Sequence, residues 1–131
     1  MEVLTVPSEL KSIKEVSDKI VAVLQTKNID KDIIFDIRLS LEEAVRNAIV
    51  HGNKTNKDLK TRVSYQLDSD KLSLIVEDQG SGFKPESLPD PTLEENLTRE
   101  KGRGVYLMIH LMDEVKYSER GNSVTMTKRL K

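Results

Sequence analysis

The sequence predicts a single α+β domain, a two-layer sandwich in which helices cover one face of a mixed, mostly antiparallel sheet. Two observations predict it: apolar residues recur at helical spacing in two early segments, and alternating apolar segments separated by short turns follow. Helices grouped in sequence beside pairs of antiparallel strands bury their apolar faces on one side of a sheet. At 131 residues the chain is long enough for one core, so we expect residues 1–131 to form one domain.

The first half of the chain predicts one strand and two helices. Residues 3–6 have the pattern of a short strand, and Ser8 after them is suited to cap a helix. Apolar residues at helical spacing over residues 10–24 predict that helix. A second apolar stripe over residues 34–48 predicts a longer helix that ends near Gly52.

A hairpin and a long loop are predicted next. Residues 62–67 and 72–78 are two strands joined by the turn at residues 68–71. Residues 79–101 hold three of the four prolines and two glycines with little periodicity, which predicts a loop. Loops of this length in a compact domain are often functional lids.

The C-terminal part of the chain predicts a short helix and a closing hairpin. The helix is expected over residues 105–112. The hairpin pairs residues 114–117 with residues 123–130 and turns at residues 120–122.

Composition excludes several classes of function. The formal net charge is −1, so no overall field attracts nucleic acid, and we expect no direct nucleic-acid partner. Cysteine is absent, which excludes a disulfide scaffold, a thiolate zinc site and a thiol nucleophile. The first residues have neither a long apolar run nor a signal-peptide core, so we expect a cytoplasmic protein without a membrane partner.

A polar row on the second predicted helix is the first candidate site. Glu43, Asn47 and His51 share a face next to the apolar stripe, because residues four apart lie on one side of a helix. An ATP site would use a carboxamide oxygen to coordinate a hard cation, and a carboxylate one turn away to polarise an attacking hydroxyl. Taken alone, the row is better explained as the solvated flank of an amphipathic helix.

The second candidate lies where a strand runs into a turn with two alternate glycines. Asp78 follows the strand on the same face as Val76, and Gly80, Gly82 and Phe83 come next. Asp78 would accept a hydrogen bond from the exocyclic amine of adenine, while the glycines would let the backbone approach the nucleotide. The spacing fits equally well a turn in which Asp78 caps backbone amides and the glycines supply positive φ.

The third candidate opens the short helix. Gly102 and Gly104 precede it, with Lys101 and Arg103 beside them and Val105 as the first apolar residue. A helix start exposes unpaired amides to an anion, and the cations add positive charge, which is the design of a phosphate cradle. A flexible loop end is the alternative. The chain contains neither the P-loop pattern nor the Rossmann pattern, so a standard P-loop enzyme is excluded.

In this order and spacing, the three motifs resemble the successive boxes of the Bergerat ATP-binding fold of the gyrase, histidine-kinase and mismatch-repair ATPase superfamily. Two longer segments, residues 43–52 and 111–115, resemble the stand-alone anti-sigma-factor serine/threonine kinases. The resemblance covers nearly the whole chain, and the small size of the protein also fits that family.

The resemblance implies a role for individual residues. Glu43 would be the general base, Asn47 the Mg²⁺ ligand, and Asp78 the acceptor for the adenine amine. Gly80 and Gly82 would form the turn that faces the nucleotide. The other residues of the implied ATP site are His51, Phe83, Lys101, Gly102, Arg103, Gly104, Val105 and Ser123.

Within that set, Gly102, Arg103 and Gly104 would contact the phosphates, and the segment between Phe83 and Lys101 would be the ATP lid. The chain departs from the family in two places. The last family box often reads Gly-Thr-Thr, where this chain has Gly-Asn-Ser ending at Ser123. Arg103 stands between two glycines, where related kinases can have an uncharged residue.

The resemblance implies a kinase that binds Mg-ATP and transfers the γ-phosphoryl group to a serine or threonine of a small anti-sigma-factor antagonist. In such partner switching the same domain alternatively binds a sigma factor, and family members act as homodimers.

Other readings of the sequence remain open. An ATP-binding regulatory module without kinase activity would carry the same motifs. The catalytic half of a histidine kinase is disfavoured, because the chain lacks a preceding helical segment with a phosphoacceptor histidine, and His51 and His110 lie in the nucleotide-binding body. A metal hydrolase is disfavoured, because the chain has no dense cluster of histidines and carboxylates.

Overall fold

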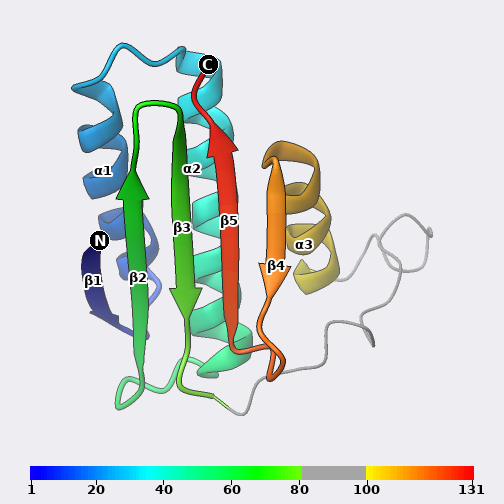
Figure 1. Cartoon of the computed structure of the whole chain (residues 1–131). Helices are drawn as coiled ribbons and strands as arrows, with labels where there is room; N and C mark the ends of the chain where they lie inside the picture. The colour runs from blue at the N-terminus through cyan, green and yellow to red at the C-terminus, as the bar shows by residue number, and fades with distance from the viewer. Residues whose placement is uncertain (81–99) are drawn as a thin grey trace.

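The protein is an antiparallel sheet with helices packed on one face (Figure 1). The computed structural model describes residues 1–80 and 100–131, and side chains in the last helix from residue 104 onward. In these ranges one sheet has the strand order β1-β2-β3-β5-β4 and every pairing is antiparallel, so the parallel part of the expected mixed sheet is not found. Its strands are β1 (Glu2–Pro7), β2 (Lys60–Leu67), β3 (Lys71–Glu77), β4 (Glu114–Tyr117) and β5 (Ser123–Arg129).

The helices lie together behind the sheet in Figure 1. They are α1 (Lys11–Gln25), α2 (Lys31–Arg46), the π-helical turn η1 (Asn47–Gly52) and α3 (Glu100–Leu111). Each predicted strand and helix is therefore present. Among the described residues, no helix has the length and apolar character that crossing a membrane requires.

The core lies between the helices and the inner face of the sheet. Alternation along β3 buries Leu72, Leu74 and Val76, as the sequence predicts. The apolar stripes of α1 and α2 cover them, and side chains such as Ile37 and Leu41 are fully buried. Burial of each large aliphatic side chain contributes about 1.5–3 kcal/mol, so the sheet and α2 hold each other in place.

The predicted long helix changes its winding before it ends. α2 begins after Asp30, whose carboxylate accepts a hydrogen bond from the amide of Asp32, and it runs to Arg46. The chain then continues as η1, and the amide of Asn53 still bonds to the carbonyl of Ala48, five residues earlier, at 2.8 Å. The helix therefore ends at Gly52 as expected, but its last turn is wound as a π-helix and not as an α-helix.

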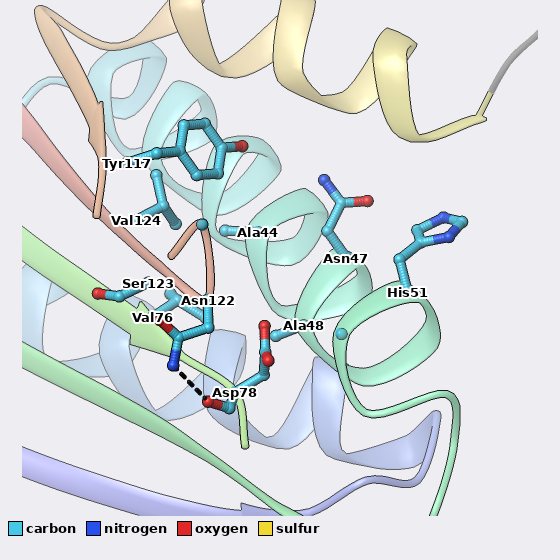
Figure 2. A pocket seen from close by; sticks show the side chains of 12 residues that line it. Ala44, Asn47, Ala48, His51, Val76, Asp78, Tyr117, Asn122, Ser123 and Val124 are labelled. Atoms are coloured by element: carbon cyan, nitrogen blue, oxygen red, sulfur yellow. Dashed lines mark hydrogen bonds between the residues drawn. The ribbon is translucent and has the colours of Figure 1, made fainter. Parts of the chain in front are cut away.

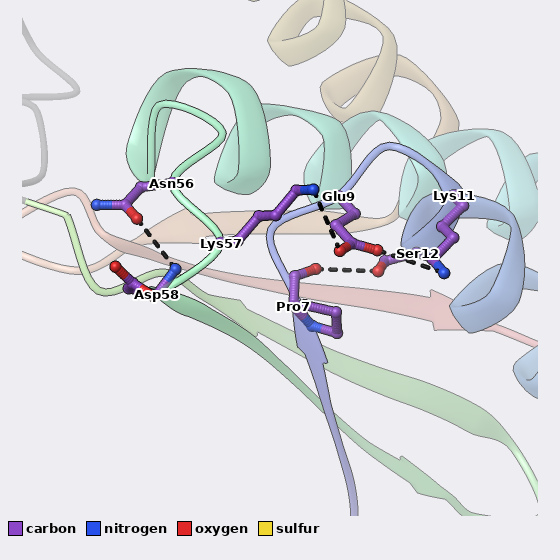
Figure 3. Close-up of polar contacts among 7 residues, drawn as sticks. All are labelled: Pro7, Glu9, Lys11, Ser12, Asn56, Lys57 and Asp58. Atoms are coloured by element: carbon purple, nitrogen blue, oxygen red, sulfur yellow. Dashed lines mark hydrogen bonds and ion pairs between the residues drawn. The ribbon is translucent and has the colours of Figure 1, made fainter.

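The prediction that Ser8 caps the first helix is wrong. α1 begins at Lys11 with Leu10 at its N-cap position and no side-chain cap. The Ser8 hydroxyl instead donates to the carbonyl of Leu59 at 2.7 Å, because the chain makes a tight corner before the helix starts. At that corner the Ser12 hydroxyl donates to the carbonyl of Pro7 at 2.9 Å (Figure 3).

Two ion pairs, each with an exposed lysine, lie at this corner, and one of them reaches the loop that precedes β2. Glu9 pairs with Lys11 at 3.5 Å and with Lys57 at 3.9 Å (Figure 3). In the same loop the side chain of Asn56 accepts a hydrogen bond from the amide of Asp58 at 3.0 Å. Because Lys57 is largely exposed, its pair with Glu9 adds little, and the hydrogen bond from Ser8 to Leu59 is the firmer link between the corner and this loop.

The third helix begins earlier than the sequence predicts. Residues 100 and 101, expected to be in the loop, are already helical. Two glycines close together argue for a loop, but Val105, Met108 and Met112 anchor the segment in the core and override that local preference. The rest of the expected loop and lid, residues 81–99, lies outside the described residues.

We expect Leu41→Ala to lower the free energy of unfolding by about 2–5 kcal/mol, since it leaves a cavity in a fully buried part of α2. Phe35→Ala on the same helix should cost far less, because the Phe35 side chain is 61% exposed. Urea unfolding followed by circular dichroism measures both. Equal losses in the two variants would contradict this account of the core.

Candidate functional site

A cleft opens between η1 and the ends of β3 and β5 (Figure 2). Its cavity volume is about 30 Å³, within about 400 Å³ of empty space that includes open solvent. Its walls come from three distant parts of the chain: the α2–η1 helix, the end of β3 and the hairpin of β4 and β5. The lining residues are Ala44, Asn47, Ala48, His51, Gly52, Val76, Asp78, Tyr117, Gly121, Asn122, Ser123 and Val124.

The floor of the cleft is apolar. Val76 and Val124 are paired neighbours on β3 and β5 and point toward the helices. Ala44 and Ala48 face them from the helix side, and their small side chains leave room between the two layers. Such a floor suits a flat, largely apolar group such as an aromatic heterocycle.

Asp78 lies where β3 leaves the sheet, and its carboxylate points into the cleft (Figure 2). Its Oδ1 accepts a hydrogen bond from the amide of Gly80 at 2.8 Å. Its backbone is held by Asn122, whose carbonyl accepts from the Asp78 amide at 2.9 Å and whose Nδ2 donates to the Asp78 carbonyl at 3.3 Å. The turn-capping role considered from the sequence is therefore present, and the same side chain lines the cleft.

Gly52 and Gly80 are glycines because the two segments touch at this point. A β-carbon on Gly52 would lie 2.2 Å from Asp78 Oδ2, and one on Gly80 would lie 1.9 Å from the carbonyl oxygen of Gly52. Neither position has space for a side chain. The requirement for glycine at residue 80 thus comes first from backbone packing, whereas the sequence suggested an approach to the nucleotide.

Asn47 is buried without a partner. Its side chain is 8% exposed, and neither Oδ1 nor Nδ2 has a hydrogen-bond partner among the described residues. A buried polar group in this state costs about 1–3 kcal/mol, which a fold tolerates when a ligand supplies the missing bonds. The amide faces the cleft, so a cation or a ligand bound there can satisfy it.

Glu43 lies one helical turn before Asn47, and α3 comes close to both. A β-carbon on Gly104 would lie 2.7 Å from Glu43 Oε2 and 3.4 Å from Asn47 Nδ2. The first and third predicted motifs are thus neighbours in space. Val105 is buried in the core, so only its main chain can contact a ligand.

The structure thus brings several predicted site residues together. Asn47, His51, Asp78 and Ser123 line one cleft, with Gly80 beside Asp78. Of the predicted polar row, Asn47 and His51 line the cleft, and Glu43 lies one helical turn before Asn47. Two sets of predictions lie outside the described residues or side chains, namely Gly82 and Phe83 in the loop and Lys101, Gly102 and Arg103 in α3.

Sequence reasoning missed several lining residues. Tyr117 and Val124 are placed there by the closing hairpin, and Asn122 by its turn, which holds Gly121 at a φ of 75°. Strand alternation carries a signal for Tyr117 and Val124, but only sheet order puts them opposite α2. Among the described residues, no group of three or more His, Cys, Asp and Glu side chains is placed to hold a metal ion.

The comparisons with known proteins agree with this geometry. The profile of a family described as the histidine kinase-like ATPase domain matches residues 6–128. The chain is also similar to the serine-protein kinase RsbW of Staphylococcus aureus. Over an alignment of 108 residues it is 33% identical to the protein of strain JH9, and the match covers 76% of this chain and 68% of RsbW. Identity to the protein of strain MSSA476 is 32% over the same length.

Two solved structures share the fold at 17% sequence identity. One is the structure of the RsbU and RsbW domains of Rv1364c from Mycobacterium tuberculosis. Its TM-score is 0.61, and the match covers 98% of this chain and 32% of the Rv1364c chain. The other is the histidine kinase domain of the blue-light activated kinase EL346 from Erythrobacter litoralis. Its TM-score is 0.54, and the match covers 95% of this chain and 61% of that one. The chain therefore spans less than two thirds of either solved chain.

We expect the stability of the protein to fall as pH rises above about 10, partly through Tyr117. Burial raises the pKa of the Tyr117 hydroxyl above its ordinary value. The unfolded chain therefore releases this proton at lower pH than the folded protein, and the stabilisation present below about pH 10 is lost as pH rises.

Tyr117→Phe should remove this contribution and make the fall in unfolding free energy between about pH 9 and 11 shallower, by at most about 1.4 kcal/mol per pH unit. Tyr106→Phe on α3, outside the cleft, is the matched control and should keep the steeper slope. Urea unfolding at several pH values tests this, and parallel slopes for the wild type and Tyr117→Phe would contradict it.

Proposed function

Because the chain belongs to the histidine kinase-like ATPase family, in the branch of the anti-sigma-factor kinases, we propose that it binds Mg-ATP and phosphorylates a protein. The acceptor is a serine or threonine of a small anti-sigma-factor antagonist. The observation that carries the proposal is the buried amide of Asn47, which has no hydrogen-bond partner in the described part of the chain and lies in the cleft that ends at Asp78.

The adenine ring binds on the apolar floor of the cleft. Val76, Ala48 and Val124 contact its faces, and Asp78 accepts a hydrogen bond from its exocyclic amine. The hydrogen bonds that hold the backbone of Asp78 support this role, because they fix the position of the carboxylate before a nucleotide arrives.

The phosphates extend from the cleft toward Glu43 and the first turn of α3. The closeness of Gly104 to Glu43 and Asn47 supports this path. Amides at the start of a helix bind anions, and the absence of a side chain at Gly104 lets α3 approach the Glu43 carboxylate closely. The oxygen of the Asn47 amide would be the protein ligand of Mg²⁺, and the bound ion would offset the negative charge of the phosphates.

Glu43 orients the acceptor hydroxyl for transfer. The bond between the γ-phosphorus and the oxygen that bridges to the β-phosphate breaks, and a bond to the acceptor oxygen forms. Glu43 takes the proton of that hydroxyl, and ADP leaves. Its location one helical turn from Asn47 places a base next to the proposed metal ligand.

Partner switching follows from the family rather than from the cleft. We propose that the protein acts in the cytoplasm as a homodimer, and that it alternatively holds a sigma factor when its antagonist is phosphorylated.

Mg-ATP should raise the melting temperature of the protein by several degrees at saturating nucleotide, since a ligand that binds only the folded state stabilises it by about 2.7 kcal/mol at one hundred times its dissociation constant. Asp78→Asn should remove most of this gain. Asp68→Asn, an exposed aspartate in the turn between β2 and β3, should keep it. Absence of any shift in the wild-type protein would overturn the ATP proposal.

Glu43→Gln should slow phosphoryl transfer to a purified anti-sigma-factor antagonist from the same organism by about 10²–10⁴-fold, while the affinity for ATP changes little. The assay follows γ-labelled phosphate on the antagonist. Glu42→Gln is the matched control, because the Glu42 carboxylate accepts a hydrogen bond from Ser17 at 2.7 Å and takes no part in the cleft. A wild-type protein that binds ATP and transfers nothing would instead be an ATP-binding regulatory module.

A further inference from the structure

We propose that Asn53, which follows η1, is a positioning residue that holds Asp78 in place for recognition of the adenine amine and so helps to set base specificity. The proposal rests on the ATP site described above. Asn53 does not line the cleft, and no sequence motif draws attention to it. Its side chain is 1% exposed and makes hydrogen bonds to several separate segments of the chain.

The oxygen of the Asn53 side-chain amide bonds to the turn that carries Asp78. Its Oδ1 accepts a hydrogen bond from the backbone amide of Gln79 at 2.8 Å. Gln79 is the central residue of the turn from Asp78 to Gly80, so this bond acts directly on the segment that aims the carboxylate. The Gln79 side chain adds a second attachment, because its Oε1 accepts a hydrogen bond from the amide of Lys60 at 2.6 Å.

The other side of the amide is anchored to the sheet. Its Nδ2 lies 2.9 Å from the Ser8 hydroxyl, 3.0 Å from the Lys60 carbonyl and 3.3 Å from the Thr61 hydroxyl. Ser8 and Thr61 are themselves fully buried. Asn53 therefore connects the corner after β1 and the start of β2 to the turn after β3, and it leaves that turn little freedom to move relative to the sheet.

The backbone around Asn53 is shaped to keep its side chain inside. The two residues that follow, Lys54 and Thr55, have φ values of 52° and 57°. A β-branched residue in this region is strained and persists only where the surroundings determine it. The Thr55 amide bonds to the Ile49 carbonyl at 2.7 Å, which turns the chain back over η1 and leaves Asn53 facing the sheet.

The segment that carries Asn53 also packs directly on Asp78. Gly52, the preceding residue, has no space for a β-carbon because Asp78 Oδ2 occupies it. Residues 52 and 53 thus contact Asp78 from one side and hold Gln79 from the other. Loss of the Asn53 amide leaves the bonds of Asp78 to Asn122 and the bond of the Gln79 side chain to Lys60 intact. It removes the bond that holds the Gln79 main chain, so the Asp78 carboxylate stays in the cleft but is less well oriented.

The ratio of the affinities for ATP and inosine triphosphate distinguishes a positioning role of Asn53 from a purely structural one. The exocyclic amine of ATP donates to a carboxylate, whereas the oxo group of inosine triphosphate presents an acceptor to it. We expect the wild-type protein to prefer ATP over inosine triphosphate by roughly tenfold or more. Asn53→Ala should reduce this ratio to about threefold or less, although Asp78 is still present.

Thr61→Val is the matched control. It removes one buried bond of the Asn53 amide on the sheet side, and the bond to Gln79 stays, so the variant loses stability and keeps the preference for ATP. Asp78→Asn removes the acceptor and should abolish the preference. Dissociation constants for the two nucleotides are measured by titration calorimetry at a temperature at which circular dichroism shows each variant to be folded.

A folded Asn53→Ala protein with the wild-type ratio would overturn the proposal for Asn53 and leave the ATP site intact. A wild-type protein that binds neither nucleotide, or an Asp78→Asn protein with an unchanged ratio, would instead overturn the proposed adenine site. Hydrogen exchange in the wild-type protein also tests the bond between the Gln79 amide and Asn53, without any substitution. The Gln79 amide should exchange its hydrogen slowly before any nucleotide is added, and rapid exchange would overturn the proposal even if Asn53→Ala does not fold.

Discussion

The geometry of the cleft depends on one contact, in which the end of η1 packs directly on the turn after β3. The two segments leave no space for a side chain, because a β-carbon on Gly52 would overlap the Asp78 carboxylate and one on Gly80 would overlap the Gly52 carbonyl. The contact ties a helix end to a strand end and sets the distance between Asn47 and Asp78. The apolar floor forms between these two points, where small alanines on the helix oppose valines on the sheet.

Several features of the site lower the stability of the folded protein. Asn47 places both polar atoms of its amide in a buried position without partners among the described residues, and two consecutive residues after η1 take left-handed φ values. Each feature costs free energy that a purely structural domain would avoid. The well-packed core of α1, α2 and the inner face of the sheet offsets that cost, which is the pattern expected where a ligand completes a site.

Much of the fold could be predicted because its elements have strong local signals. Alternation along β3 identifies the buried face on which Leu74 and Val76 lie, and the stripe on α2 identifies the face that covers them. Two of the predictions that failed did so because tertiary contacts overrode a local signal. Ser8 has the chemistry of a helix cap but lies at a corner where its hydroxyl is needed by Leu59, and the glycines before Val105 conceal a helix that the core stabilises.

The sequence by itself determined the types of element, the identity of Glu43, Asn47 and Asp78 as candidates, and the family that their order resembles. These properties follow from residue chemistry and from spacing along one strand or one helix. Only the tertiary structure decided that Asn47 has no partner within residues 1–80 and 104–131, that Gly104 lies against Glu43, and that Asn53 bonds to the turn that carries Asp78. Such relations join residues far apart in the chain, and no local pattern encodes them, because they arise from the order of the strands and from the way the helices pack on the sheet.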